Sequence, residues 1–264
     1  MKTGSVTIRD NAVVEYFTFG TGERAFIILP GIDVKSILLA AKNIEAAYRD
    51  FKEDYTVYVF DRRKEIPEGY TAFDMADDAA SAIEALGIRG ADIFGTSQGG
   101  MIAMMIAAYH PELVHALVLA STTAWKNLTV DGVFRRWIGF AEKRDITGLT
   151  ADFIECLYSE KTIRNYRDFL MHMNDHVSDE ALDRFIRLVK TIDTFDMRDK
   201  LSLIHCPTFV IGVEGDAAVS GESSREIARL IGCELYMYEG YGHCVFDEAP
   251  DYKQRLLDFY RKHR

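Results

Sequence analysis

Three residues with complementary chemistry stand just beyond apolar runs that lie far apart in the sequence. Ser97 lies in GTSQG, Asp216 in PTFVIGVEGDAAV and His243 in EGYGHCVFDEAP. A serine hydroxyl is a poor nucleophile until a base such as imidazole accepts its proton, and a carboxylate commonly orients that imidazole. If the fold brings the three together, they can attack a carbonyl group.

The GTSQG sequence has the strand–turn–helix context in which a serine is raised above a sheet. The run ADIFG is typical of a buried strand, and a helix is predicted from Gln98 onward. Residues two before and two after the serine approach closely in such a turn, and Gly95 and Gly99 are small enough. The helix N-terminus would then point free N–H groups at an oxyanion. The alternative is a glycine-rich turn with an incidental serine.

His243 is the best candidate for the base among seven histidines. Its glycine-flanked loop follows the last predicted strand, so it should reach the same sheet edge as Ser97. A solvated surface histidine is the alternative. Three other histidines are expected far from this edge: His110, His205 and His263.

Asp216 is the best candidate for the orienting carboxylate, because it directly follows a buried strand. Glu214 is the nearby rival. Asp247 is too close to His243 in sequence to reach back easily, and no carboxylate follows the preceding strand at Ser121. A helix-capping aspartate is the alternative interpretation of Asp216.

The hydrophobic pattern predicts the elements that position these residues. Two alternating strands, one near Val6 and Ile8 and one over 13–19, join at Asp10-Asn11 and form an antiparallel edge. Continuous apolar runs typical of buried strands follow, separated by helical patterns such as 37–51, 71–87 and 98–110. This alternation predicts an α/β fold with a mostly parallel, doubly wound sheet.

Residues 122–200 interrupt the alternation with a helical pattern, so we expect a helical cap inserted into a core made of 1–121 and 201–264. The aromatic residues of this insertion, with Met171 and Met173, are expected mainly to form its packing core. A cap over Ser97 would still present some apolar surface to a mostly apolar pocket. Arg62 and Arg63 could bind a carboxylate there, although a solvated charge pair is favoured.

Composition narrows the class of protein. The chain has 264 residues, 48% hydrophobic residues and a net charge of −10, which disfavours binding to nucleic acid or to an anionic membrane. Its four cysteines lack CxxC or zinc-ligand spacing, so reduced thiols and a cytoplasmic location are expected. His172 and His176 have helical i, i+4 spacing, but no third ligand is evident. We expect a small-molecule substrate, no metal or cofactor, and a monomer or homodimer.

Over nearly its whole length the sequence resembles the α/β-hydrolase family, through ILPGI, YVFDRR, GTSQGG, PTFVIGVEGD and GYGHCVFDEAPDYKQRLLDFY. The likeness is greatest to the branch of esterases, lactonases and C–C-bond hydrolases that carry a lid. It implies the triad order Ser97, Asp216, His243, and an oxyanion hole from the backbone N–H groups of Ile32 and Gln98.

Two departures from the family accompany this likeness. Pro30 stands where the family commonly has histidine, so the oxyanion loop could be held differently. KEIPEGYT replaces the usual glycine-rich stretch after Arg63.

The resemblance implies a serine hydrolase that cleaves a carboxylester or lactone of a small, partly apolar substrate through an acyl-enzyme. Fold alone does not decide the substrate. A C–C bond hydrolase, a thioesterase and an aminopeptidase are alternatives within the fold. A ligand-sensing module that does not turn over is the alternative from another functional class.

Overall fold

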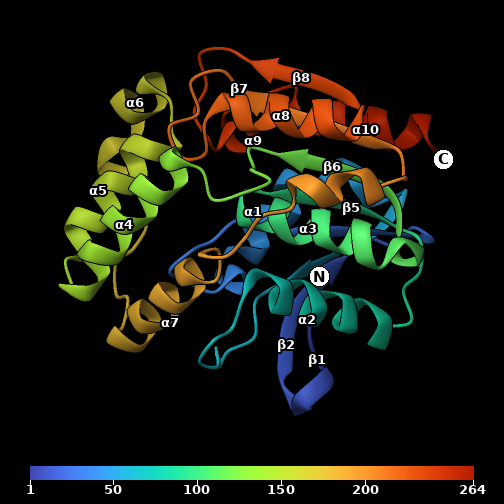
Figure 1. The fold of residues 1–264 in the computed structure, drawn as a ribbon, viewed down its shortest axis with the longest axis horizontal. Coiled ribbons are helices and arrows are strands. Elements are labelled where there is room, and N and C mark those ends of the chain that lie inside the picture. The colour runs from blue at the N-terminus through green and yellow to red at the C-terminus, as the bar shows by residue number, and fades with distance from the viewer.

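Eight strands form one sheet in the computed structural model, which describes residues 1–264 (Figure 1). They are β1 (Lys2–Thr7), β2 (Val13–Phe19), β3 (Arg24–Leu29), β4 (Tyr55–Phe60), β5 (Ala91–Thr96), β6 (Val114–Ala120), β7 (Thr208–Val213) and β8 (Glu234–Tyr238). Their spatial order is β1-β2-β4-β3-β5-β6-β7-β8. The pairs from β4 to β8 are parallel, and β1 and β2 form an antiparallel edge. The predicted α/β class and mostly parallel sheet are confirmed.

Ten α-helices connect and cover these strands. They are α1 (Ala41–Ala47), α2 (Ala72–Ala85), α3 (Gln98–Tyr109), α4 (Leu128–Glu142), α5 (Ile146–Leu157), α6 (Glu160–Leu170), α7 (Asp179–Lys190), α8 (Gly221–Ile231), α9 (Val245–Glu248) and α10 (Tyr252–Lys262). None of them combines the length and the apolar character that crossing a bilayer requires. Thr71 caps α2 with a reciprocal hydrogen-bond pair to Asp74, as its position before the helix predicts.

The prediction of a single helix over 37–51 is wrong in detail. The segment consists of a 3₁₀ turn (Ile37–Ala40), the short α1, and a second 3₁₀ turn (Arg49–Phe51). Tyr48 leaves helical geometry at φ −104°, and the ring of Phe51 stacks 4.8 Å from that of Phe26 on the sheet. The apolar residues of 37–51 have helical spacing, but the helix is broken where aromatic rings pack against the sheet.

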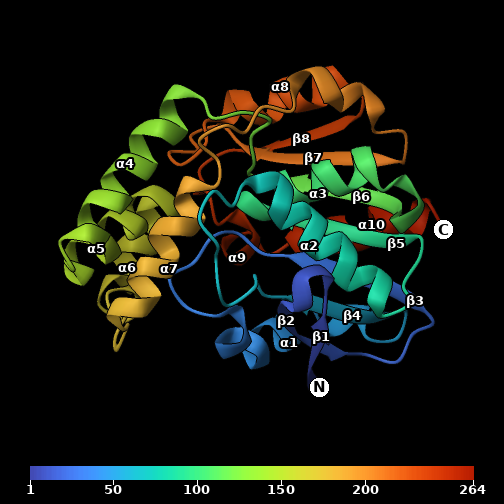
Figure 2. The ribbon, with the colours of Figure 1, turned by 60° about the horizontal axis from the view of Figure 1, so that its bottom comes forward.

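Side chains of each buried strand alternate between two cores, one on each face of the sheet. Ile27 and Ile93 belong to the core that includes residues of α2, α3 and α8, whereas Phe26 and Phe94 belong to the core that includes residues of α10. Figure 2 shows the same two layers, with α2, α3 and α8 on one side of the sheet and α10 on the other. Because both faces are covered, these strands read as continuous apolar runs.

The helices α4 to α7 lie together beyond the carboxyl ends of the parallel strands (Figure 1). We call residues 122–200, which contain them, the helical segment. Its interior is aromatic: the ring of Trp137 lies 4.4 Å from that of Phe153 and 5.2 Å from that of Phe134. The chain enters this segment directly after β6 and leaves it before β7, and an isolated β-bridge between Trp125 and Asp196 brings the two ends of the segment together.

Candidate active site

Ser97 occupies a strained turn between β5 and α3. Its backbone has φ 52° and ψ −124°, a conformation that L residues rarely adopt. The turn is fixed on both sides, because the Ser97 N–H donates to the carbonyl of Ala120 at 3.0 Å and Thr122 Oγ1 donates to the Ser97 carbonyl at 2.7 Å. A strained conformation held this firmly is characteristic of a side chain whose direction matters.

Close packing explains the glycines around Ser97. A Cβ atom on Gly95 would lie 2.6 Å from the carbonyl oxygen of Gly99, and one on Gly99 would overlap the backbone of Leu29. The tight approach expected from the GTSQG motif is therefore present. A Cβ on Gly31 would lie 3.2 Å from the Ser97 Cβ, so the loop after β3 runs directly beside the serine.

His243 and Asp216 form a buried hydrogen-bonded pair. The His243 Nδ1 atom lies 2.9 Å from Oδ2 and 3.0 Å from Oδ1 of Asp216, and the side chains are only 3% and 1% exposed. The same carboxylate accepts the N–H groups of Ala218 at 2.9 Å and Val219 at 3.0 Å. Because an ionised carboxylate only accepts hydrogen bonds, Nδ1 carries the proton and Nε2 is left free to act as a base.

The rival carboxylates have other surroundings. Glu214 forms an ion pair with Arg225 at the surface, and Asp247 on α9 makes no hydrogen bond to His243. Asp216 is therefore the carboxylate that contacts the imidazole.

Ser97 and His243 line the same cavity, which has a volume of about 340 Å³. No hydrogen bond joins the Ser97 hydroxyl to His243 in this structure, so the three candidate residues are brought to one site but are not fully connected. Hydrogen bonds of this kind are often long without substrate and shorten when it binds. The helical segment contributes part of the cavity wall: Trp137, Phe153, Leu157, Tyr158 and Met173. Met173, expected mainly as packing, thus faces the cavity.

The two candidate oxyanion donors have free N–H groups. Gln98 is the first residue of α3, so its N–H has no acceptor within the helix, and the N–H of Ile32 donates to no other protein group. Ile32 and Ser97 both line the cavity. Two unused donors beside the serine could hold a developing negative charge.

Arg62 holds the loop that carries Ile32, a role that the sequence did not reveal. Its Nη2 donates to the carbonyl of Pro30 at 2.7 Å and lies 3.5 Å from Oε1 of Gln98. Burial of the guanidinium lowers the pKa of Arg62 to about 10. Pro30 stands where the family commonly has histidine, and in this structure Arg62 fixes the carbonyl of that proline.

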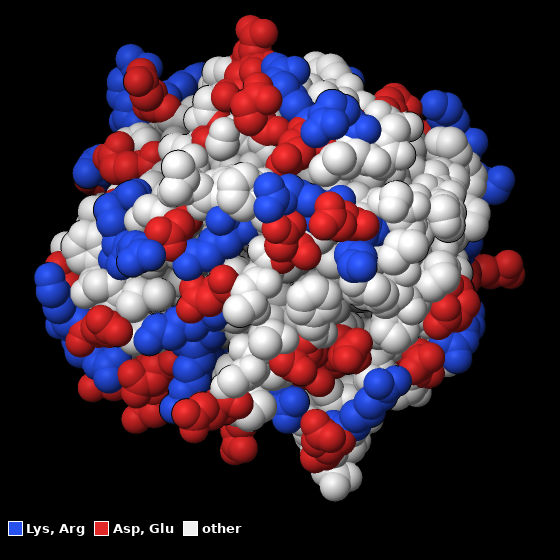
Figure 3. Space-filling model, viewed as in Figure 1, with Lys and Arg blue, Asp and Glu red and all other residues white.

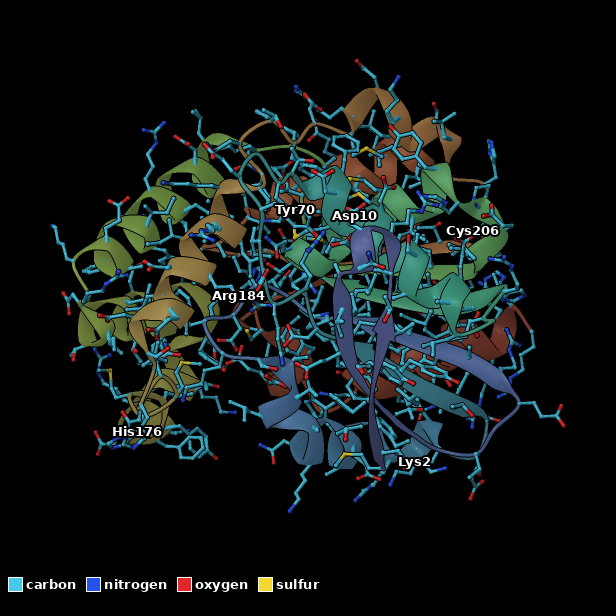
Figure 4. The ribbon with its side chains drawn as sticks, turned by 90° about the horizontal axis from the view of Figure 1, so that it is seen from below. Lys2, Asp10, Tyr70, His176, Arg184 and Cys206 are labelled. Atoms are coloured by element: carbon cyan, nitrogen blue, oxygen red, sulfur yellow. The ribbon has the colours of Figure 1, made fainter.

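The prediction that Arg62 and Arg63 form a solvated charge pair is wrong, because both side chains are partly covered by protein. Neither residue lines the cavity of Ser97. Arg63 forms an ion pair with Asp78 at 3.4 Å and lies over the ring of Tyr70. Arg184 of α7 reaches across to this stretch and donates to the carbonyls of Arg62 and Arg63, at 2.9 and 3.1 Å (Figure 4). These half-buried arginines join the helical segment to the loop that follows β4.

Glu248, also missed from sequence, ties the His243 loop to the helical segment. Its Oε2 accepts the N–H of Gly242 at 2.7 Å, and its Oε1 accepts both the hydroxyl and the N–H of Ser159 at 2.6 and 3.0 Å. The N–H of Cys244 also donates to the carbonyl of Leu157 at 2.8 Å. The only sign of this role in the sequence is that a glutamate follows the candidate base by a few residues. Because many helices have a glutamate in their first turn, that sign is not specific.

The histidine pair of the helical segment does not share a helical face. Helix α6 ends at Leu170, and His172 and His176 lie in the turns that follow it. The imidazole of His172 pairs with Asp175 at 2.8 Å, and Figure 4 shows His176 at the outer rim of the molecule. The i, i+4 spacing was therefore misleading, because the chain leaves the helix between α6 and α7.

Comparison with known proteins gives one consistent result. A family model described as the alpha/beta hydrolase fold matches residues 25–250. A protein of Pseudomonas syringae named as a carbamate hydrolase, RutD, is 26% identical over 219 residues, covering 77% of this chain and 82% of its own length. The 3-oxoadipate enol-lactonase 1 of Acinetobacter baylyi is 23% identical over 212 residues, covering 76% of each chain.

A solved structure has nearly the same fold. MGS-M2, an alpha/beta hydrolase enzyme from a deep-sea metagenome library of the Medee basin, superimposes with a TM-score of 0.88. The two chains are 23% identical, and the match covers 97% of each. At this identity the likeness concerns the fold and not the substrate.

Proposed function

The chain belongs to the α/β-hydrolase fold family, and from this premise we propose that it is a serine hydrolase acting on a carboxylester or lactone through an acyl-enzyme. Hydrolase-named relatives support the general class. The observation that carries the proposal is the buried His243–Asp216 pair, whose imidazole shares a cavity with the strained Ser97. A small, partly apolar substrate suits a cavity with a mainly apolar wall.

In the proposed reaction, His243 Nε2 accepts the proton of Ser97 as the hydroxyl oxygen attacks the substrate carbonyl. The negative charge that develops on the carbonyl oxygen is held by the N–H groups of Ile32 and Gln98, each worth on the order of 3 kcal/mol of barrier. Asp216 stays ionised and stabilises the imidazolium through Nδ1.

The second half of the reaction uses the same groups in reverse. His243 returns its proton to the leaving oxygen, and the acyl group stays bonded to Ser97 Oγ. A water molecule then gives a proton to His243 and attacks the acyl carbon. When the bond between the acyl carbon and Ser97 Oγ breaks and the acid leaves, His243 passes that proton to Oγ and the serine is regenerated. None of these steps calls for a group beyond the residues named.

We further propose that the helical segment (122–200) acts as a lid on a core made of 1–121 and 201–264. Five of its side chains line the cavity wall, and Glu248 and Arg184 join it to the loops that carry the chemistry. A lid of this kind would exclude water and shape the acyl site.

The second candidate bond is a carbamate, because the relative from Pseudomonas syringae is named as a carbamate hydrolase. Attack of Ser97 on a carbamate carbonyl would use the same base and the same oxyanion donors.

Turnover of short p-nitrophenyl esters tests the proposal. We expect steady release of p-nitrophenol that is lost in Ser97→Ala, together with labelling of Ser97 by a fluorophosphonate. Matched p-nitrophenyl N-alkylcarbamates separate the two candidate bonds. If Ser97 reacts rapidly with the carbamate but the enzyme does not turn it over, the ester is favoured as the substrate. A saturable thermal shift with neither turnover nor labelling would support a ligand-sensing module instead.

A further inference from the structure

The wall of the cavity that contains Ser97 includes acidic residues but no lysine or arginine. Asp33, in the loop after β3, and Asp247, on α9, both contribute to its wall, and no lysine or arginine does. The face of the molecule drawn in Figure 3 is different, because Lys and Arg are interspersed there with Asp and Glu. The negative charge of the cavity wall is therefore a local property and does not simply follow from the net charge of the chain.

Both aspartates are exposed residues of the cavity wall. Reduced hydration beside the neighbouring protein raises the pKa of each carboxyl above its usual value, which reflects the cost of holding a charge there. Asp33 accepts a hydrogen bond from the N–H of Lys35 at 3.2 Å, and the carboxylate of Asp247 accepts none from the protein. Both carboxylates thus keep acceptor capacity for a ligand.

Two other side chains of the cavity wall experience the same negative surroundings. Burial raises the pKa of the Cys244 thiol, and four carboxylates raise it further: Asp247, Asp216, Glu248 and Asp33. Burial likewise raises the pKa of the Tyr158 hydroxyl, and Asp247 and Asp33 add to the shift. Cys244 and Tyr158 both line the cavity, so the negative potential extends across its wall.

The nearest positive groups lie outside the cavity wall. Lys35 adjoins Asp33 but does not line this cavity. The ammonium of Lys253 donates to the carbonyl of Phe246 and lies 5.7 Å from the centre of the Tyr48 ring, which itself lines the cavity. These lysines moderate the charge of the aspartates without offering a partner to a bound carboxylate.

We propose, on the basis of the function proposed above, that this cavity selects substrates whose acyl group carries a positively charged ammonium head and rejects substrates that carry a carboxylate. A carboxylate entering the cavity would lose water, meet two like charges and find no cationic partner. An ammonium group would gain Asp33 and Asp247 as ion-pair partners. It would also meet the aromatic residues Tyr158 and Trp137 of the cavity wall, and aromatic rings attract cations.

Three p-nitrophenyl esters of similar length and different charge test this selectivity. They are the esters of 6-aminohexanoate (cationic), heptanoate (neutral) and the monoester of adipate (anionic). At low ionic strength we expect kcat/KM for the cationic ester to exceed that for the anionic ester by at least about tenfold, and the ratio to shrink as salt is added. An equal or larger kcat/KM for the adipate ester would overturn the proposal.

Substitutions assign the selectivity to the two aspartates. Asp33→Asn and Asp247→Asn keep the shape of the side chain and remove its charge, so each should lower the cationic-to-anionic ratio several-fold, and the double variant should bring it close to one. Asp50→Asn is the matched control, since Asp50 is 70% exposed on the surface and should leave the ratio unchanged. A ratio that survives the double variant would contradict the assignment.

A binding measurement separates this proposal from the proposed function. Calorimetry with the Ser97→Ala protein compares hexyltrimethylammonium with hexanoate and needs no turnover. Tighter binding of the cation, weakened in the Asp33→Asn/Asp247→Asn background, supports charge selection even if no ester is cleaved. Ester cleavage that depends on Ser97 but ignores charge would instead leave the serine hydrolase standing and remove the charge selection.

Discussion

Two histidine–aspartate pairs stand at opposite edges of the same sheet. His243 and Asp216 follow the carboxyl ends of β8 and β7, whereas His115 and Asp92 lie at the amino ends of β6 and β5. The distance from Nδ1 to the nearer carboxylate oxygen is 2.9 Å in both pairs. Hydrogen-bond geometry alone therefore does not distinguish a candidate catalytic pair from a structural one.

The surroundings of the two carboxylates differ. Asp92 also accepts hydrogen bonds from Arg24 at 3.0 Å and from the hydroxyl of Tyr55 at 2.8 Å, so its charge is balanced by a cation. Asp216 is held by backbone N–H groups, and no lysine or arginine bonds to it. An unbalanced carboxylate can stabilise an imidazolium that forms during a reaction, whereas a balanced one mainly holds neighbouring strands together.

The strongest test of this comparison replaces each histidine by alanine. His243→Ala should lower kcat for a p-nitrophenyl ester by about 10⁶-fold, because the base and nucleophile act as one unit. His115→Ala should change kcat less than about twofold, since His115 lies at the far edge of the sheet. Steady-state kinetics on both variants, with circular dichroism as the folding control, decides the matter. Comparable losses in the two variants would show that the pairs are not distinct in function.

Replacing the aspartates separates catalysis from stability. Asp216→Asn should reduce kcat by about 10⁴-fold, because the amide no longer favours the tautomer with a proton on Nδ1. Asp92→Asn should leave kcat nearly unchanged but lower the free energy of unfolding by about 1–3 kcal/mol, because Arg24 then lacks a carboxylate partner. Urea denaturation measures the second effect. Unchanged stability in Asp92→Asn would mean that the network at the amino edge is dispensable.

Arg62→Met tests whether the oxyanion loop needs its guanidinium. Losing the hydrogen bond to the Pro30 carbonyl should displace the Ile32 N–H and lower kcat by up to about 10²-fold, with a smaller change in KM. Arg198→Met is the control, because Arg198 lies on the surface over Trp125. If kcat stays at the wild-type value, the loop is held by its own backbone and Arg62 only packs.

Glu248→Ala should have the smallest effect on catalysis. The substitution removes the acceptor shared by Gly242 and Ser159, so the His243 loop should loosen and kcat fall by about tenfold. Glu248→Gln keeps one acceptor oxygen and should recover part of this loss, whereas Glu239→Ala, on an exposed position of the preceding turn, should lose nothing. An identical kcat in Glu248→Ala and the wild type would rule out the positioning role.

The sequence by itself determined the fold class, the antiparallel edge and the candidates Ser97, Asp216 and His243. Each depends on local information: apolar runs make strands, a cramped turn requires glycine at Gly95 and Gly99, and residues after parallel strands gather at one edge. The helical pattern over 37–51 and the spacing of the two histidines after α6 failed because local periodicity does not reveal where packing or turns end a helix.

Only the tertiary structure decided which charges meet. Arg62 donates to the Pro30 carbonyl and does not line the cavity, Glu248 joins the His243 loop to the helical segment, and Asp33 and Asp247 remain on the cavity wall. A sequence specifies how many charged side chains exist, but their partners depend on chain segments that are remote from one another. Because a buried charge is stabilised or penalised by whatever surrounds it in space, its role cannot be assigned before the segments are brought together.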